Sequence, residues 1–428
     1  MKHTIPTETL GPLGELMANA VTRCVHCGFC LPACPTYTVL GEEMDSPRGR
    51  IILMKSVLEG DIELADAIPY VDRCLGCLGC TTACPSGVPY GELITPFRAY
   101  AQERRQRPVA ERLARRVTRE TLPYPSRFRL AAKAGNLAKP IGKVFPVQFQ
   151  AMLKMLPDTL PPSPPLPTYY PAQGNPHARV GLIIGCIQNA ISPEINWATL
   201  RVLSRNGVEV LIPPDQGCCG ALALHTGDHV TARKFASALS QVFPPDLDAI
   251  LTNAAGCGSS IHEYPLLFRT SDHGEALDLF ARKVMDISVF LDQLGIEPPP
   301  PLPSQLKAAY HDACHLAHAQ GITTAPRRLL AQIPELSVVP IPEGDICCGS
   351  AGSYNLEQPE IAQMLGERKA RYILSTDADI IITGNIGCLS QLQYHIKRVV
   401  SHNEDQHKQP LVFHTIELLD RAYRGWSD

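Results

Sequence analysis

The chain contains two matching stretches, Cys24-Val-His-Cys-Gly-Phe-Cys-Leu-Pro-Ala-Cys34-Pro35 and Cys74-Leu-Gly-Cys-Leu-Gly-Cys-Thr-Thr-Ala-Cys84-Pro85. Each has the spacing C-x2-C-x2-C-x3-C-P, which is the run that binds [4Fe–4S] clusters in bacterial ferredoxins. Three sulfurs of such a run lie on one tight loop, and in two-cluster proteins the last cysteine of each run ligates the other cluster. The two stretches therefore predict a pair of [4Fe–4S] clusters with exchanged ligands.

The exchange rule assigns four ligands to each cluster. The first set is Cys24, Cys27, Cys30 and Cys84, and the second set is Cys74, Cys77, Cys80 and Cys34. Zinc sites built from C-x2-C pairs would leave the third and fourth cysteines of each run unexplained. A disulfide framework requires a secreted protein. Iron–sulfur ligation accounts for all eight residues because the full spacing occurs twice.

Composition bounds the class of protein. The 428 residues predict two or three domains, and 45% apolar residues can fill real cores. A formal charge of −3 gives no indication of nucleic-acid binding. The first residues lack the apolar core of a secretory signal, and no stretch approaches the ~20 apolar residues of a membrane span. With 16 cysteines, these features predict a reducing compartment and metal chemistry, and any membrane association must be peripheral or through a partner.

A helix is predicted between the two cysteine runs. In Asp45-Ser-Pro-Arg-Gly-Arg50, Asp45 or Ser46 can cap the helix, Pro47 suits its first turn and Gly60 can end it. The insertion predicts an α-helical ferredoxin domain over residues 1–155. Its basic extension, residues 98–129, holds ten arginines and three glutamates, a local balance of +7. This extension is either a solvated helical surface or a docking surface for an acidic partner or anionic lipid.

A proline-rich segment, residues 156–178, separates this domain from the rest and predicts a stiff linker. Beyond it the chain is duplicated. Residues 179–297 contain a strand pattern before Cys186, then Cys218-Cys219-Gly220, then a strand pattern before Cys257. Residues 298–428 repeat this order at Cys314, Cys347-Cys348-Gly349 and Cys388, and the offsets are 128, 129 and 131 residues. Asp292 and Asp420 also match, 128 residues apart.

Helical patterns separate the strands of each copy. The predicted fold is therefore α+β and multi-domain: an α-helical ferredoxin-like domain followed by a duplicated α/β Cys-Cys-Gly domain with parallel sheets. Ligand sites of open α/β sheets assemble beyond the strand ends, where these cysteines fall. Two further centres are possible, one at Cys186, Cys218, Cys219 and Cys257, and one at Cys314, Cys347, Cys348 and Cys388.

Four thiolates suit an iron–sulfur cluster or zinc, whereas the alternative is a set of buried structural cysteines. Nearby histidines are more often satisfied surface or core residues than ligands, so none is assigned; they are His225, His229, His311, His315 and His318. The sequence shows no dinucleotide-binding, P-loop or nucleophile-elbow motif. No catalytic residue is assigned, and the chain is expected to conduct electrons between a catalytic partner and an acceptor.

The chain resembles the iron–sulfur subunits of glycolate oxidase over nearly its whole length. The most specific stretches are Cys24-Val-His-Cys-Gly-Phe-Cys30, Asp45-Ser-Pro-Arg-Gly-Arg-Ile51, Cys84-Pro-Ser-Gly-Val88, Ile346-Cys-Cys-Gly-Ser-Ala-Gly-Ser-Tyr354 and Asn385-Ile-Gly-Cys388. The resemblance implies an oxidoreductase complex in which an FAD flavoprotein oxidises glycolate to glyoxylate. This chain would pass the electrons to a quinone or another membrane acceptor. The resemblance also implies a cytoplasmic location with peripheral association with the inner membrane.

Related subunits serve lactate and glycerol-3-phosphate dehydrogenases and heterodisulfide reductase, so the resemblance leaves these functions as alternatives. A scaffold whose clusters only stabilise the fold is a non-redox alternative. One feature departs from heterodisulfide-reductase domains, whose third strand continues as Cys-x-x-Cys. Here Ser260 and Gln391 occupy the last position of that motif. Five thiolates are therefore not available in either copy.

Overall fold

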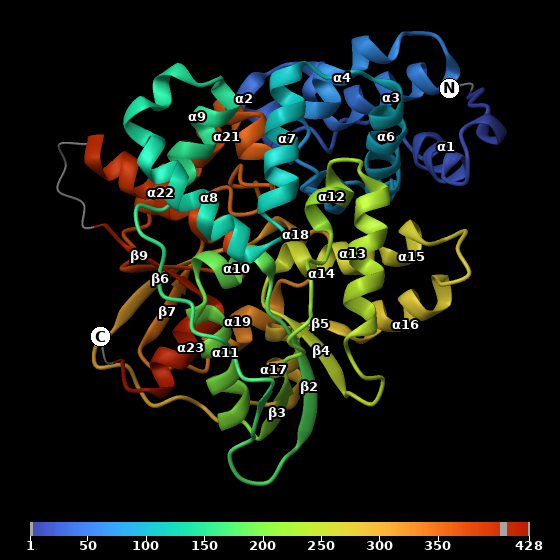
Figure 1. Ribbon diagram of the computed structural model, residues 1–428. Helices are drawn as coiled ribbons and strands as arrows, with labels where there is room; N and C mark the ends of the chain where they lie inside the picture. Colours follow the sequence, from blue (N-terminus) through green and yellow to red (C-terminus); the bar gives the residue numbers. More distant parts are fainter. Residues whose placement is uncertain (1–2, 403–408, 427–428) are drawn as a thin grey trace.

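The computed structural model describes residues 3–402 and 409–426, and it contains a helical N-terminal part and two sheet-containing units (Figure 1). The N-terminal helices are α1 (Gly14–Thr22), α2 (Pro35–Leu40), α3 (Pro47–Glu59), α4 (Leu64–Arg73), α5 (Gly79–Thr82) and α6 (Gly91–Arg104), with short 3₁₀ turns at Thr7–Thr9 and Glu43–Asp45. The predicted helix between the cysteine runs is α3. Ser46 caps it by accepting a hydrogen bond from the Gly49 amide at 3.0 Å, and Gly60 ends it in the left-handed conformation.

A helical extension follows α6 and covers both sheet-containing units. It consists of α7 (Val109–Thr121), α8 (Pro125–Ala138), the 3₁₀ turn η3 (Lys139–Val144) and α9 (Val147–Met155). Helix α8 packs on the first unit and α9 on the second. Part of the proline-rich segment that follows is attached to the first unit. Its residues Tyr169–Tyr170 form strand β1, which pairs antiparallel with β3 (Val208–Leu211) of that unit.

The first unit is built on a sheet of order β1-β3-β2-β4-β5. Its other strands are β2 (Ala178–Ile183), β3 (Val208–Leu211), β4 (Ala249–Thr252) and β5 (Val284–Asp286), all mutually parallel. Its helices are α10 (Cys186–Ile191), α11 (Glu194–Arg205), α12 (Ala221–His225), α13 (His229–Gln241), α14 (Ala255–His262), α15 (Tyr264–Leu267), α16 (Gly274–Lys283) and α17 (Ile287–Leu294).

The second unit repeats this topology in a fully parallel sheet of order β7-β6-β8-β9. Its strands are β6 (Leu306–His311), β7 (Leu336–Val339), β8 (Ile380–Thr383) and β9 (Leu411–His414). Its helices are α18 (Cys314–Ala317), α19 (Thr324–Leu330), α20 (Tyr354–Glu357), α21 (Pro359–Leu374), α22 (Ile386–His402) and α23 (Thr415–Tyr423). The predicted duplication and its parallel sheets are confirmed.

The two units pack against each other with approximate two-fold symmetry. Arg201 on α11 donates to Asp420 on α23 at 2.9 Å and 2.7 Å, and Arg328 on α19 donates to Asp292 on α17 at 2.8 Å. Each aspartate therefore binds an arginine of the other unit, which explains why the sequence repeats it. One apolar core that includes Leu203, Leu291, Leu329 and Leu419 fills the interface beneath these pairs. In the part of the chain that the structure describes, no helix is long and apolar enough to cross a membrane.

Candidate metal centres

The two cysteine loops of the N-terminal part share two left-handed positions, one on each side of the second cysteine. His26 and Gly28 adopt positive φ angles of 55° and 90°, and the matching Gly76 and Leu78 adopt 68° and 61°. Leu78 accepts a conformation that branched or bulky residues rarely adopt. The repeated left-handed positions allow each loop to turn tightly around its second cysteine.

The structure places the last cysteine of each run beside the other loop. Burial raises the pKa of Cys24, and the neighbouring thiols of Cys84 and Cys27 raise it further. A cavity of about 30 Å³ is lined by the first set, Cys24, Cys27, Cys30 and Cys84, together with Cys80. Burial likewise raises the pKa of Cys80, with added contributions from Cys74 and Cys34. Both arrangements fit the exchanged ligand sets that the spacing predicts.

A buried arginine lies against the second set. The Arg50 side chain is 1% exposed; it donates to the Tyr70 carbonyl at 2.7 Å and to Asp45 at 3.0 Å, and its guanidinium lies 3.8 Å from the Cys34 sulfur. Burial lowers the pKa of Arg50, but Cys74, Tyr90, Cys34 and Asp45 outweigh this effect and leave the pKa above its ordinary value. Arg50 therefore places a permanent positive charge beside thiolates and any anionic group that they hold.

The two sets differ in exposure. Cys27 of the first set is exposed, and its neighbours Val25 and Phe29 are 67% and 66% exposed. Cys34, Cys74 and Cys80 of the second set are buried.

The second set also adjoins the second α/β unit. Leu75 packs in one apolar cluster with Cys314 and Cys347, and Cys77 lies at its edge. Tyr354 donates to the Arg73 carbonyl at 2.8 Å, and His318 bonds Thr82 at 2.9 Å. The N-terminal part is thus joined to the second unit next to that unit's own cysteines.

The predicted thiol set of the first α/β unit comes together beyond the strand ends. Cys186 begins α10, Cys218 and Cys219 lie on the loop before α12, and Cys257 lies in α14. The Cys186 sulfur contacts that of Cys218 at 3.5 Å. Hydrogen bonds from Cys186 and Cys219 lower the pKa of Cys218, which favours its thiolate form.

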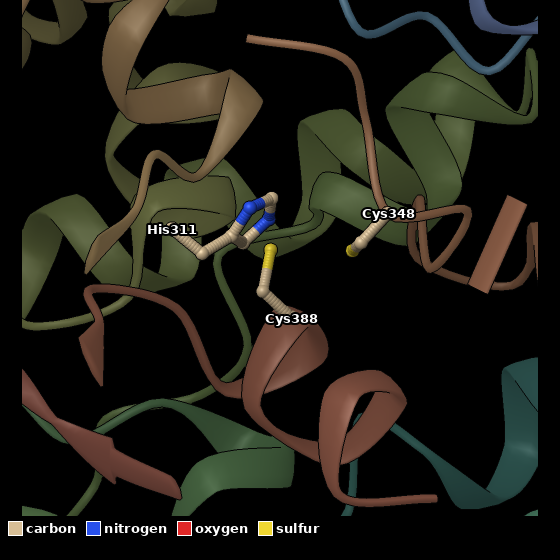
Figure 2. Close-up of side chains that lie close together, drawn as sticks. All are labelled: His311, Cys348 and Cys388. Carbon is tan, nitrogen blue, oxygen red and sulfur yellow. The ribbon is translucent and has the colours of Figure 1, made fainter. Parts of the chain in front are cut away.

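The set of the second unit has the same layout, with one addition. Cys314 begins α18, Cys347 and Cys348 lie on the loop before α20, and Cys388 lies in α22. The Cys314 and Cys347 sulfurs are 3.7 Å apart. Hydrogen bonds from Cys347 and Cys388 lower the pKa of Cys348. His311, which the sequence analysis left unassigned, ends β6 and turns its ring toward Cys348 and Cys388 (Figure 2).

Most of the other nearby histidines have ordinary partners. His225 bonds Ser260 at 3.2 Å, and His318 bonds Thr82 and the Asp345 carbonyl. His315 bonds Ser259 at 2.6 Å, and burial lowers its pKa to about 4. Ser260 and Gln391 occupy the positions where a fifth cysteine would stand, and each makes a hydrogen bond. Ser260 bonds the His225 ring, and Gln391 donates to the Cys348 carbonyl at 3.4 Å.

Both α/β thiol sets open onto one cavity of about 500 Å³. Cysteines of the two units and apolar residues of the helical extension, among them Phe128, Phe149 and Leu153, line this cavity. The two-fold packing of the units is what brings the carboxyl ends of both sheets to this common space.

Several arginines of the basic extension, residues 98–129, form contacts with other parts of the molecule. Arg105 binds Asp72 at 2.7 Å, Arg115 binds Glu357, and Arg129 donates to the Ala190 carbonyl at 2.8 Å. These arginines attach the extension to the cysteine domain and to both α/β units. The two predicted roles, a solvated surface and a docking surface for a partner or lipid, did not include such internal contacts. Arg112, Arg116 and Arg119 remain exposed.

Comparisons with known proteins agree with this architecture. Residues 20–88 match the 4Fe-4S dicluster domain, and residues 180–262 and 308–393 each match the Cysteine-rich domain named CCG. The chain is 35% identical to the probable glycolate oxidase iron–sulfur subunit of Bacillus subtilis, with 90% of each chain covered. It is also 35% identical to the glycolate oxidase iron–sulfur subunit of Escherichia coli, over 90% of this chain and 93% of that one.

The chain belongs to the family of glycolate oxidase iron–sulfur subunits. A relative with a shorter chain is also similar: lactate utilization protein A of Oceanobacillus iheyensis is 29% identical over 58% of this chain and 98% of its own length. The chain is therefore an iron–sulfur subunit of the glycolate oxidase and lactate utilization type, a class of oxidoreductase subunits that work in multi-subunit complexes.

Exchange of the fourth ligands gives a specific prediction. Cys34→Ser should perturb the cluster at Cys74, Cys77 and Cys80 and leave the cluster at Cys24, Cys27 and Cys30 intact. Cys84→Ser is the matched control and should do the opposite. Low-temperature electron paramagnetic resonance of the reduced, anaerobically purified protein distinguishes the two signals. Loss of the first-loop signal in Cys34→Ser would contradict the assignment.

The position of Arg50 predicts an effect on redox potential. At an effective dielectric constant of about 20, a unit charge about 5 Å away contributes ~3 kcal/mol, on the order of 100 mV for one electron. Arg50→Met should therefore lower the midpoint potential of the second cluster by tens of millivolts or more in a redox titration. Arg48→Met serves as the comparison: Arg48 lies beside the first loop but is 30% exposed, so solvent should reduce its effect. Unchanged potentials in Arg50→Met would contradict this interpretation.

Proposed function

We propose that this chain is the electron-transfer subunit of a flavin-dependent glycolate oxidase. A partner subunit with FAD would oxidise glycolate to glyoxylate, and a quinone or another acceptor at the membrane would receive the electrons. The likeness to two glycolate oxidase iron–sulfur subunits over 90% of the chain carries this proposal. The two four-cysteine sets of the N-terminal part support it, because they fit a pair of [4Fe–4S] clusters.

Each cysteine set has a distinct task in this proposal. Cys24, Cys27, Cys30 and Cys84 would hold one [4Fe–4S] cluster, and Cys34, Cys74, Cys77 and Cys80 the other. Such clusters supply one-electron transfer. The first set is the one that a redox partner could approach, because Cys27 is exposed between Val25 and Phe29. Exposed apolar side chains of this size are suited to a protein contact. The second set is enclosed and faces the second α/β unit.

The helical extension is proposed as the contact with an anionic membrane surface. Half of the large apolar side chains that are strongly exposed in the described part of the chain fall between Val109 and Val147. They are Val109, Leu113, Tyr124, Leu130, Leu137, Ile141, Val144 and Val147. Exposed cationic residues lie on the same elements: Arg112, Arg116, Arg119, Lys133 and Lys143. Apolar side chains combined with cationic ones are typical of helices that lie in a membrane interface.

This location also suits the acceptor. Apolar residues of the extension also line the 500 Å³ cavity onto which both α/β thiol sets open. A membrane contact at the extension would bring the lipid near that cavity, and apolar walls fit a hydrophobic acceptor such as a quinone. The peripheral location predicted from the sequence would then depend on α7–α9 and not on the whole of residues 98–129.

Dependence on a flavoprotein is directly testable. The purified, flavin-free chain should not reduce an artificial dye with glycolate, because no residue set of the chain is assigned to bind a flavin or a 2-hydroxy acid. Adding the flavoprotein subunits should restore glycolate-dependent dye reduction. A complex assembled with the double variant Cys34→Ser/Cys84→Ser should keep flavin reduction by glycolate but lose electron transfer to a quinone. Glycolate oxidation by the isolated chain would contradict the proposal.

The membrane contact is tested with vesicles that contain phosphatidylglycerol. Leu137→Asp/Val144→Asp replaces two side chains that are 85% and 80% exposed, so the fold should be retained. Each apolar side chain buried in an interface contributes roughly 1–2 kcal/mol, so flotation with vesicles should fall about tenfold or more. Leu279→Asp, on α16 and 60% exposed, is the matched control and should bind normally.

Normal vesicle binding by the double variant, together with loss of a co-purifying subunit, would assign this surface to a protein partner. Binding of the unchanged protein should also weaken as salt increases, since the cationic contribution is screened over a Debye length of ~8 Å. Salt-independent binding would contradict a role for the arginines and lysines of the extension.

A further inference from the structure

A second cavity, also of about 500 Å³, is lined by α7 and by the helices α12 and α13 of the first unit (Figure 1). Its walls contain five arginines but only two carboxylates, those of Asp228 and Glu357. Even with Cys218, which also lines the cavity, as a thiolate, positive charge is in excess. The five arginines are Arg107, Arg112, Arg115, Arg116 and Arg119.

Three of these arginines are paired with carboxylates of the chain. Arg119 pairs with Asp228 at 3.0 Å, and Arg115 pairs with Glu357. Arg107 lies beside two further carboxylates, at 3.4 Å and 3.5 Å. These ion pairs attach α7 to its neighbours and compensate the charge of the three arginines.

The other two arginines, Arg112 and Arg116, have no such partner. Both are exposed, and within the described residues neither guanidinium makes an ion pair or a hydrogen bond. They lie one turn apart on α7, and like charges at this spacing repel each other. An anion between them would remove this repulsion, and the planar guanidinium group matches the oxygens of a phosphate. The cavity therefore contains two cationic donors that are available to an oxyanion.

Apolar side chains share this face of α7. Val109, Arg112, Leu113 and Arg116 have the i, i+3, i+4, i+7 spacing that places residues on one side of a helix. All four line the cavity, and Val109 and Leu113 are 71% and 52% exposed. A small hydrated anion such as inorganic phosphate would gain nothing from these apolar side chains. A ligand that carries both a phosphate and hydrocarbon would contact both kinds of residue.

We propose that this cavity binds the phosphate headgroup of one anionic phospholipid molecule, with Arg112 and Arg116 as donors to the phosphate oxygens. The apolar residues of the same helical face would contact the first carbons of the acyl chains. This inference rests on the proposed membrane contact of the extension and adds a specific lipid site to it. The site also adjoins the cavity of the thiol sets, because Arg115 and Cys218 line both. A bound lipid would therefore lie next to the place proposed for the acceptor.

Binding of a short-chain phosphatidylglycerol, used below its critical micelle concentration, tests the site without a membrane. Isothermal titration calorimetry of the full chain, purified anaerobically, should show saturable binding of about one lipid per chain. Arg112→Gln/Arg116→Gln should weaken this binding about tenfold or more, because two charge-assisted hydrogen bonds to the phosphate are lost. Arg104→Gln/Arg127→Gln removes two arginines that are 44% and 57% exposed and lie outside the cavity; it is the matched control and should bind normally.

Two further ligands identify the source of the phosphate. Inorganic phosphate should bind about tenfold more weakly than the lipid or worse, and so should phosphatidylcholine of the same chain length, whose headgroup has no net charge. Leu113→Ser should weaken the binding of phosphatidylglycerol but not that of inorganic phosphate. Equal affinity for inorganic phosphate and for the lipid would assign the cavity to a soluble anion and overturn the lipid site.

The outcome is separable from the vesicle contact. Leu137→Asp/Val144→Asp changes residues outside the cavity, so this variant should retain short-chain lipid binding while it loses vesicle binding. Equal lipid affinity of Arg112→Gln/Arg116→Gln and of its control would overturn the proposal, and this result would leave the vesicle contact and glycolate-dependent electron transfer unaffected. Loss of a co-purifying acidic protein from Arg112→Gln/Arg116→Gln, with unchanged lipid binding, would assign the two arginines to a protein partner instead.

Discussion

Burial of the Arg50 guanidinium is the constraint on which the N-terminal part depends. Moving an unpaired cation out of water costs several kcal/mol, so the chain must surround it with acceptors and negative charge. Asp45 and the Tyr70 carbonyl provide part of this, and Cys34 and Cys74 from the two cysteine runs provide the rest. Arg50 thus binds together the inserted helix, its capping turn and both cysteine loops. The same charge favours thiolates, which are the form of cysteine that binds iron.

The second constraint is the two-fold packing of the duplicated units. Ion pairs of Arg201 with Asp420 and of Arg328 with Asp292 are repeated across the interface, and the apolar core beneath them joins the two sheets. Partly exposed ion pairs contribute little energy individually. These ion pairs instead fix the orientation of the two units, and in this orientation the carboxyl ends of both sheets face one cavity. The helical extension then closes that cavity and uses several of its arginines as internal attachments.

The sequence predicted the features that depend on local spacing. The cysteine runs, the capped helix after Ser46, the duplication and its parallel sheets could all be identified, because each follows from short-range pattern and periodicity. The uses of Arg105, Arg115 and Arg129 could not, since their partners Asp72, Glu357 and the Ala190 carbonyl are distant in sequence. The sequence also contains a signal for His311 that the prediction did not use. At the matching position of the first copy, 128 residues earlier, the residue is Ile183. The strand β1 was missed because two tyrosines among prolines show no strand periodicity.

The difference between the two units indicates divided roles after duplication. In the first unit the strand-end residue Ile183 is apolar, and the four thiols border the shared cavity together with His225. In the second unit the matching residue is His311, whose ring lies beside Cys348 and Cys388, and Cys314 and Cys347 pack against Leu75 of the second cysteine loop. Thiols of both units border the cavity, whereas Cys314 and Cys347 of the second unit also pack against the N-terminal cysteine loop, so this unit is the one coupled to the buried thiol set.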